Sequence, residues 1–152
     1  MLFNNNEMDH HETIFGLETT QLKFGRNSLN ELGWEISKHG STKILLVIDP
    51  ILHDFDVTQR ILDQVKSSAA EVVTYDNISI EPTLKSFENA SQFALENSFD
   101  LIIAAGGGST IDTAKVANLI KVCGGKVMDY VNFPIGKGKN PASELLPLRA
   151  IP

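Results

Sequence analysis

The sequence predicts an α/β fold, a doubly wound parallel sheet with helices on both faces. Short apolar runs with polar ends alternate with segments of helical periodicity, the pattern of strands joined by right-handed helical crossovers. The expected strands at 43–48 and 100–105 each have one charged residue, Lys43 or Asp100, followed by a continuous apolar run, as expected of strands buried on both faces. With 152 residues, 42 % of them hydrophobic, the chain is long enough for one domain with a sizeable core.

The first half of the chain is interpreted as a leader followed by alternating helices and strands. Residues 1–12 are polar and rich in Asn, which is typical of a disordered leader. Two short β-like runs, 13–17 and 21–24, suggest a small hairpin. Apolar residues at helical spacing predict a helix over 28–39, and Gly40 is placed to end it. A strand at 43–48, a helix at 58–68 and a strand at 71–75 follow.

The second half continues the alternation as far as Gly124. Pro82 and Thr83 begin a helix whose predicted inward face comprises Leu84, Phe87, Ala90, Phe93, Ala94 and Leu95. A strand at 100–105 and a helix at 109–122 come next, then a predicted loop at 128–141 and a last short strand at 148–151. No closing helix covers that strand, so we expect the chain to be a piece of something larger, with residues 13–152 as one ligand-binding domain.

Composition narrows the classes of partner. A net charge of −6 provides no basic surface for nucleic acid or anionic lipid, so a small soluble ligand is expected. No apolar stretch approaches the ~18 residues of a membrane span. The single cysteine, Cys123, excludes an internal disulfide, and the first residues lack the basic and apolar blocks of a signal peptide. These features predict a cytoplasmic protein.

Three consecutive glycines, Gly106, Gly107 and Gly108, stand between a buried strand and a helix. Open α/β sheets bind ligands at this carboxyl edge. Glycines can take positive φ and let backbone N–H groups approach a ligand, while the helix from Ser109 adds free donors and the positive end of its dipole. A phosphate or pyrophosphate fits such a site. The alternative is a tight turn capped by Ser109, with Asp112 completing a capping box.

Asp49, which follows the first buried strand, is the candidate acceptor of a hydrogen bond from a ribose hydroxyl. The usual dinucleotide fingerprint has the order G-x-G-x-x-G and then an acidic residue, whereas here the acidic residue comes first. If the two strands are neighbours, the carboxylate would bind a free ribose 2′-hydroxyl and repel a 2′-phosphate, favouring NAD over NADP. An Asp-Pro turn with Pro50 is the alternative interpretation.

The stretch Gly106–Lys115, GGGSTIDTAK, resembles the GGGSxxDxAK motif of the iron-dependent alcohol dehydrogenase family. Four further phrases fall in the family's order, which extends the resemblance from about Thr13 to the end of the chain: Tyr75–Thr83, Phe99–Leu119, Asp129–Lys139 and Pro147–Pro152. They are most similar to the branch that contains hydroxyacid-oxoacid transhydrogenase. The resemblance implies the Rossmann-like, dehydroquinate synthase-like N-terminal domain of that family, truncated before the helical metal-binding domain.

The same resemblance implies roles for individual residues. Gly106, Gly107, Gly108 and Ser109 would contact the pyrophosphate of NAD, Asp49 would discriminate NAD from NADP, and Asp112 would lie near the nicotinamide and substrate. The family's divalent metal, iron or zinc, would be held by residues beyond this sequence, so neither a metal ligand nor a catalytic residue is assigned. The chain departs from the family pattern at one place. Many family members have Pro-Asn-Pro where this chain has Ile80, Glu81 and Pro82.

Hydride transfer between an alcohol or hydroxy acid and a carbonyl is therefore the expected activity of the full-length protein, with this chain alone inactive. A homodimer is left open. Three alternatives stand beside this interpretation. They are a relative of glycerol dehydrogenase or dehydroquinate synthase, a stand-alone nucleotide-binding module without catalysis, and an α/β phosphate binder that uses no nicotinamide.

Overall fold

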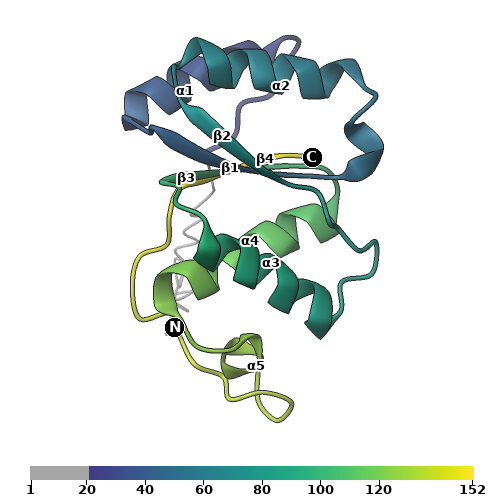
Figure 1. Cartoon of the computed structure of the whole chain (residues 1–152), viewed down its shortest axis with the longest axis vertical. Coiled ribbons are helices and arrows are strands. Elements are labelled where there is room, and N and C mark those ends of the chain that lie inside the picture. Colours follow the sequence, from purple (N-terminus) through teal and green to yellow (C-terminus); the bar gives the residue numbers. More distant parts are fainter. Residues whose placement is uncertain (1–20) are drawn as a thin grey trace, which may run out of the picture.

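The computed structural model describes residues 21–152, which form a parallel sheet between two layers of helices (Figure 1). The strands are β1 (Lys43–Ile48), β2 (Glu71–Tyr75), β3 (Leu101–Ala105) and β4 (Leu148–Ile151). Their spatial order is β2-β1-β3-β4, and every neighbouring pair is parallel. The predicted α/β class and its parallel sheet are confirmed.

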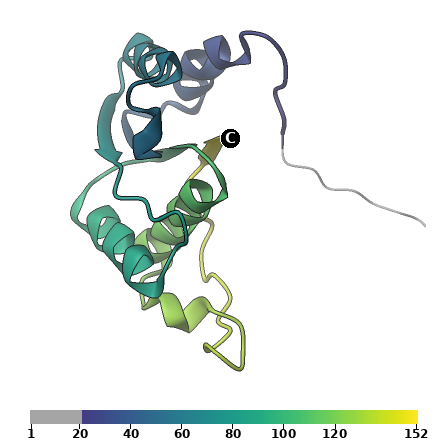
Figure 2. The ribbon, with the colours of Figure 1, turned by 90° about the vertical axis from the view of Figure 1, so that its right-hand side faces the viewer.

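Helices cover both faces of this sheet. They are α1 (Leu32–His39), α2 (Asp56–Ser67), α3 (Leu84–Glu96), α4 (Gly108–Cys123) and the short α5 (Val127–Tyr130), with 3-10 turns at Ser28–Glu31 and Pro50–Leu52. The views in Figures 1 and 2 place α1 and α2 on one face of the sheet and α3 and α4 on the other. The sheet is therefore doubly wound.

Two apolar layers hold the helices to the sheet. The central strands β1 and β3 alternate between them: Ile44, Leu46 and Ile48 belong to the layer under α1 and α2, whereas Leu45 and Val47 belong to the layer under α3 and α4. Each of these side chains is at most 1 % exposed. Burial of one such side chain contributes about 1.5–3 kcal/mol, and burial on both faces explains why these strands are continuously apolar.

The ends of the helices follow local chemistry that the sequence already carries. Gly40 takes a left-handed conformation, φ 68°, at the end of α1, which glycine adopts without steric cost. Thr83 caps α3: its Oγ1 accepts from the Ser86 N–H at 3.1 Å, and the Ser86 Oγ accepts from the Thr83 N–H at 2.9 Å. Both predicted helix ends are confirmed.

Two expectations about the N-terminal region have different outcomes. Residues 21–24 are not a strand: Leu22 and Phe24 are 83 % and 95 % exposed and pair with no strand of the described residues. Alternating apolar residues specify a strand only where a neighbour supplies the hydrogen bonds and the packing. The predicted leader at 1–12 and the other half of the hairpin at 13–17 lie outside the described residues.

Three details of the predicted helices are wrong. Leu84 and Leu95 are 44 % and 49 % exposed rather than inward, because the buried stripe of α3 runs through Ala90, Ser91 and Ala94 and leaves both leucines outside it. The first turn of the helix predicted over 28–39 is a 3-10 turn. The predicted loop at 128–141 begins inside α5, whose first turn is closed by the Asp129 carboxylate accepting from the Lys126 N–H at 3.1 Å.

Candidate functional site

The carboxyl ends of β1 and β3 form a topological switch point. These strands are neighbours, yet the helix after β1 lies on one face of the sheet and the helix after β3 lies on the other. The divergence opens a crevice at the strand ends, where open α/β sheets bind ligands. The backbone N–H of Asp49 donates to the Ala105 carbonyl at 3.0 Å, so the two predicted parts of the site do meet.

Gly106 is the glycine that this backbone requires. Its φ is 143°, a conformation that L side chains rarely adopt. A Cβ at this position would lie 2.6 Å from the Thr110 Oγ1 and 3.0 Å from the Asp49 Cβ. Its N–H donates to the Ile151 carbonyl at 3.0 Å, which ties the loop to β4. Gly106 therefore brings the loop close to Asp49 and α4.

Gly107 and Gly108 serve a different purpose. Gly107 has an ordinary φ of −70°. We expected that all three glycines could take a positive φ, but of the three only Gly106 has one. A Cβ on either residue would meet no atom within 4 Å. The N–H groups of Gly107, Gly108 and Ser109 donate to no acceptor in residues 21–152. These three N–H groups are thus free donors, and the space beside Gly107 and Gly108 is open.

A cleft of about 260 Å³ lies beside the loop. It is lined by Asp49, Ile51, Leu52, Val57, Ala105, Gly106, Gly107, Ile151 and Pro152. Its wall is mainly apolar, with one carboxylate and the glycine backbone as polar elements. An apolar wall beside a few fixed polar groups is typical of a site for a small organic ligand.

Asp49 confirms one of the two interpretations of its sequence position, and the other stays a prediction. Its Oδ1 accepts from the Ile51 N–H at 3.1 Å and caps the turn Pro50–Leu52, so the Asp-Pro turn is confirmed. The other carboxylate oxygen has no hydrogen-bond partner among the described residues. One oxygen holds the turn, and the second is left to accept from a ligand hydroxyl at the cleft.

Ser109 and Asp112 do not cap α4. The helix begins at Gly108, its N-cap is Gly107, and no side chain caps it, so the capping-box alternative is wrong. Ser109 instead donates its hydroxyl hydrogen to the Ile80 carbonyl in the loop between β2 and α3. Asp112 is exposed and pairs with Lys115 at 3.3 Å. The structure brings Ser109 to the glycine loop and places Asp112 one turn further along α4.

Thr110 is the residue at this site that sequence reasoning missed. It is completely buried, and its Oγ1 has no hydrogen-bond partner in the described structure. The hydroxyl faces the position that a Cβ on Gly106 would occupy. Nothing in the sequence marks a threonine within a helix as special, because its burial depends on the close approach of the glycine backbone.

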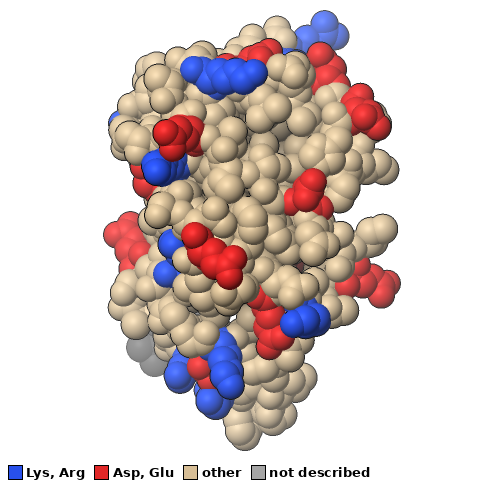
Figure 3. Space-filling view, in the orientation of Figure 1, with Lys and Arg blue, Asp and Glu red and all other residues tan. Residues whose placement is uncertain are grey.

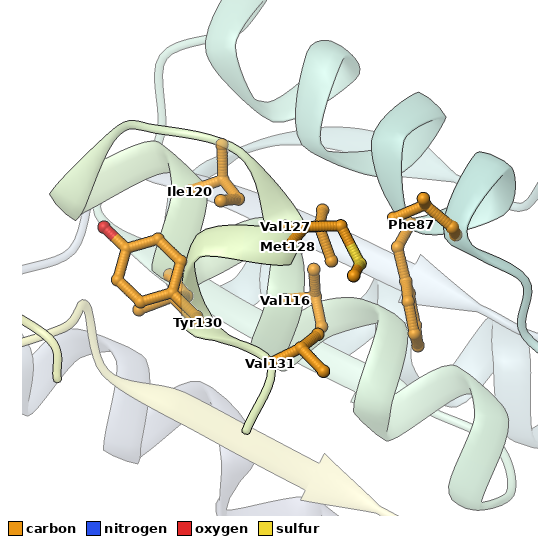
Figure 4. A pocket seen from close by; sticks show the side chains of 9 residues that line it. Phe87, Val116, Ile120, Val127, Met128, Tyr130 and Val131 are labelled. Carbon is orange, nitrogen blue, oxygen red and sulfur yellow. The ribbon is translucent and has the colours of Figure 1, made fainter. Parts of the chain in front are cut away.

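A slightly larger cavity, about 300 Å³, lies between α3, α4 and α5 and shares no residue with the cleft at the glycine loop (Figure 4). It is lined by Leu84, Phe87, Val116, Leu119, Ile120, Val127, Met128, Tyr130 and Val131. With no charged residue in this lining, the cavity offers a phosphate nothing to bind. The cleft beside Asp49 is therefore the better site for an anionic ligand.

Three further observations concern the surface charge, metal ligands and membrane-spanning helices. Figure 3 shows acidic and basic side chains interspersed over the face in view, without a broad basic patch. Among residues 21–152, no three His, Cys, Asp or Glu side chains come together as candidate metal ligands. No helix in the same range has the length and apolar character needed to cross a membrane.

The family model described as iron-containing alcohol dehydrogenase matches residues 19–152. The chain belongs to the iron-containing alcohol dehydrogenase family. The resemblance of the glycine motif to this family is confirmed, and so is the fold that it implied.

Relatives and solved structures agree with this family. The hydroxyacid-oxoacid transhydrogenase, mitochondrial, of Rattus norvegicus is 36 % identical over 140 residues, covering 91 % of this chain and 30 % of the relative. The structure of NADH-dependent butanol dehydrogenase A from Thermotoga maritima has a TM-score of 0.79 at 22 % identity, covering 91 % of this chain and 34 % of the other.

A second solved structure is a complex with a cofactor. Sulfoacetaldehyde reductase from Bifidobacterium kashiwanohense, in complex with NAD+, has a TM-score of 0.73 at 24 % identity, covering 86 % of this chain and 33 % of the other. At such identities these structures support the fold. The chain spans about a third of the length of the relatives that it matches, which agrees with the expectation of a piece of a larger protein.

The iron in the family's name has no ligand set in the described part of this chain. Isolated histidines such as His39 and His53 are bonded to Arg149 and Asp76 respectively, and neither belongs to a cluster of metal-binding side chains. A metal ion of the family would therefore need ligands from outside residues 21–152.

Proposed function

We propose that this chain binds NAD and forms the dinucleotide-binding part of an iron-type alcohol dehydrogenase. The observation that carries the proposal is the set of N–H groups of Gly107, Gly108 and Ser109, which have no acceptor among the described residues and lie at the switch point of the sheet. A pyrophosphate is the group that such donors bind best, because it brings several acceptor oxygens to the positive end of α4.

The neighbouring residues fit the rest of a dinucleotide. The free oxygen of Asp49 would accept from a ribose hydroxyl, and the apolar wall of the cleft would cover the attached ring. A carboxylate at that point disfavours an additional phosphate, so NAD is preferred to NADP. The exposed carboxylate of Asp112, further along α4, is assigned to the nicotinamide side of the site.

Hydride transfer is the chemistry that a bound nicotinamide supplies. From the similarity to hydroxyacid-oxoacid transhydrogenase, we propose that the full-length protein oxidises a hydroxy acid, or another small alcohol, and reduces an oxo acid. The residues of this chain hold and orient the dinucleotide in that reaction. Catalytic inactivity of this chain alone, its cytoplasmic location and a homodimer remain predictions.

Calorimetric titration of the 152-residue chain with NAD, and with NADP in parallel, tests the proposal. Binding of NAD in preference to NADP is the expected result. Equal binding of the two would remove the role given to Asp49. If the folded chain binds inorganic pyrophosphate but neither dinucleotide, the site would be that of a simple phosphate binder, and the proposed function would be rejected.

A further inference from the structure

The cavity between α3, α4 and α5 is suited to an apolar side chain (Figure 4). Its one side-chain hydroxyl, that of Tyr130, donates to the Gly124 carbonyl at 3.0 Å. A buried water needs several polar partners, whereas a dry apolar cavity of about 150 Å³ holds a benzene ring. This cavity measures about 300 Å³, and its lining residue Leu84 is 44 % exposed. It therefore opens to the surface and has room for an aromatic ring.

The loop 131–139, which follows α5, presents two exposed apolar side chains beside this cavity. Phe133 and Ile135 are 84 % and 77 % exposed, and neither lines the cavity, although Val131 at the start of the loop does. The Gly138 N–H donates to the Val131 carbonyl at 2.9 Å, which closes the loop with Phe133 outside the cavity of its own chain. Contiguous exposed apolar surface of this kind marks a site of interaction.

We infer that this face joins two copies of the chain, with the Phe133 ring of each copy seated in the cavity of the other. A two-fold contact is made by the same surface on both copies, so that surface must contain both the group that inserts and the place that receives it. The loop 131–139 and the cavity supply both, and they adjoin at Val131. Aromatic side chains in desolvated pockets contribute most of the binding energy of such interfaces.

Charge complementarity favours a second copy as the partner. The stretch 127–139 contains two lysines and one aspartate, a net charge of +1. The stretch 81–88, which contributes Leu84 and Phe87 to the cavity wall, contains two glutamates and one lysine, a net charge of −1. These last three side chains belong to exposed residues and form no ion pair within residues 21–152. Each copy thus brings its positive loop to the negative rim of the other.

Sedimentation equilibrium of the 152-residue chain is the first test. The unmodified chain should form dimers, and Phe133→Ser should weaken the dimer at least about thirtyfold, as for loss of a strong aromatic contact. Phe24→Ser is the matched control and should leave the dimer unchanged. Phe24 is 95 % exposed, and the adjacent Lys23 Nζ is 2.7 Å from the Glu35 carboxylate of α1, so Phe24 lies beside the other layer of helices.

Two results of this test would overturn the inference. A chain that stays monomeric up to about 0.5 mM would mean that something else, such as the part of the full-length protein outside this chain, covers the face. A dimer that is lost in Phe24→Ser but kept in Phe133→Ser would have its interface at α1. Because the cavity shares no residue with the cleft at the glycine loop, neither result depends on whether the chain binds NAD.

A mixing experiment tests the reciprocal contact itself. Val116 lines the cavity from α4, and Val116→Phe should fill the cavity with a ring of its own chain. Each variant alone has lost both ring–cavity contacts, whereas a heterodimer of Phe133→Ser with Val116→Phe keeps one of the two. The heterodimer should therefore be at least about tenfold tighter than either homodimer, measured by energy transfer between labelled variants.

Equal affinities of the heterodimer and the homodimers would contradict the inference. Circular dichroism establishes that both variants are folded. If Val116→Phe does not fold, Leu84→Phe takes its place, because Leu84 is partly exposed at the rim of the same cavity and tolerates a larger side chain better than a buried position.

Discussion

At the scale of single residues, the three glycines of the loop are not equivalent. Gly106 is required by the protein, since its φ of 143° and the nearby Thr110 and Asp49 leave no place for a side chain. Gly107 and Gly108 have ordinary space around them, and the protein itself would accept a larger residue there. Their lack of side chains fits the proposed approach of a ligand to the backbone.

This difference predicts opposite results for two substitutions. Gly107→Val should fold normally and lose NAD binding at least about tenfold, because a branched side chain blocks the phosphate from the free N–H groups. Gly106→Ala should instead lower the free energy of unfolding by at least about 2 kcal/mol. Calorimetric titration and thermal denaturation measure the two effects. A folded Gly107→Val with full affinity for NAD would disprove the phosphate site.

Asp49 can be tested for its two roles separately. Asp49→Asn keeps an oxygen for the Ile51 N–H but removes the negative charge, so it should raise the affinity for NADP relative to NAD while leaving the turn intact. Asp49→Gly should shift the ratio in the same direction with at most a few tenths of a kcal/mol of lost stability. An unaltered ratio in both variants would leave Asp49 with its structural role only.

At the scale of elements, the segment after α5 shows why a loop can be ordered without regular structure. The Asp129 carboxylate is 2.7 Å from the Lys137 Nζ and 3.5 Å from the Lys139 Nζ. Backbone hydrogen bonds join Lys137 to Met128 and Lys139 to Asp129, at 3.1 Å and 2.9 Å. Both lysines of the loop are thus paired with Asp129, which lies in α5.

This cluster predicts a pH dependence. The hydrogen bond from Lys137, followed by that from the Lys126 N–H, lowers the pKa of Asp129 from 3.8 to about 2. Because the folded pKa is depressed, the charged carboxylate stabilises the fold above the unfolded pKa, and its contribution is lost as the pH falls from about 4 through about 2. Asp129→Asn should therefore lower Tm at about pH 7, with the difference from the unmodified chain shrinking at about pH 2. A constant difference in Tm would contradict the assignment.

The orientation of α3, which buries one face and exposes the other, gives a prediction about stability. Leu95, half exposed at the margin of the buried stripe, should be replaceable by Ala at a cost within about 0.5 kcal/mol. The same change at Leu101, which is fully buried in β3, should cost about 2–5 kcal/mol. Urea denaturation of the two variants provides the comparison. Similar losses would mean that Leu95 is buried in solution.

At the scale of the whole molecule, the site exists because of strand order. Asp49 and Gly106 are separated by more than fifty positions in the sequence, and they meet because β1 and β3 pair in parallel at the centre of the sheet. The helices that follow these strands leave on opposite faces, which opens the crevice between them. The inverted order of the acidic residue and the glycines is therefore compatible with the same spatial arrangement as the usual fingerprint.

Much of this arrangement could be predicted from the sequence, because its signals are local. Continuous apolar runs specify strands buried on both faces, and glycine and threonine at helix ends act within a single turn. The glycine motif likewise identified the family, and it predicts the loop that we propose to bind a ligand. The predictions for residues 21–24 and Leu95 were wrong, because strand pairing and side-chain burial at these positions depend on which distant segment lies beside them.

The sequence by itself determined the class of the fold, the order of its elements, the loop proposed to bind phosphate and the family of the chain. Only the tertiary structure decided that one glycine alone needs positive φ, that Asp49 caps a turn with one oxygen and frees the other, and that the hydroxyl of Ser109 is bonded to Ile80. The physical reason is the range of the forces involved. Periodicity and capping act over a few residues, whereas hydrogen bonds and steric contacts between distant segments exist only once the strands have paired in the folded sheet.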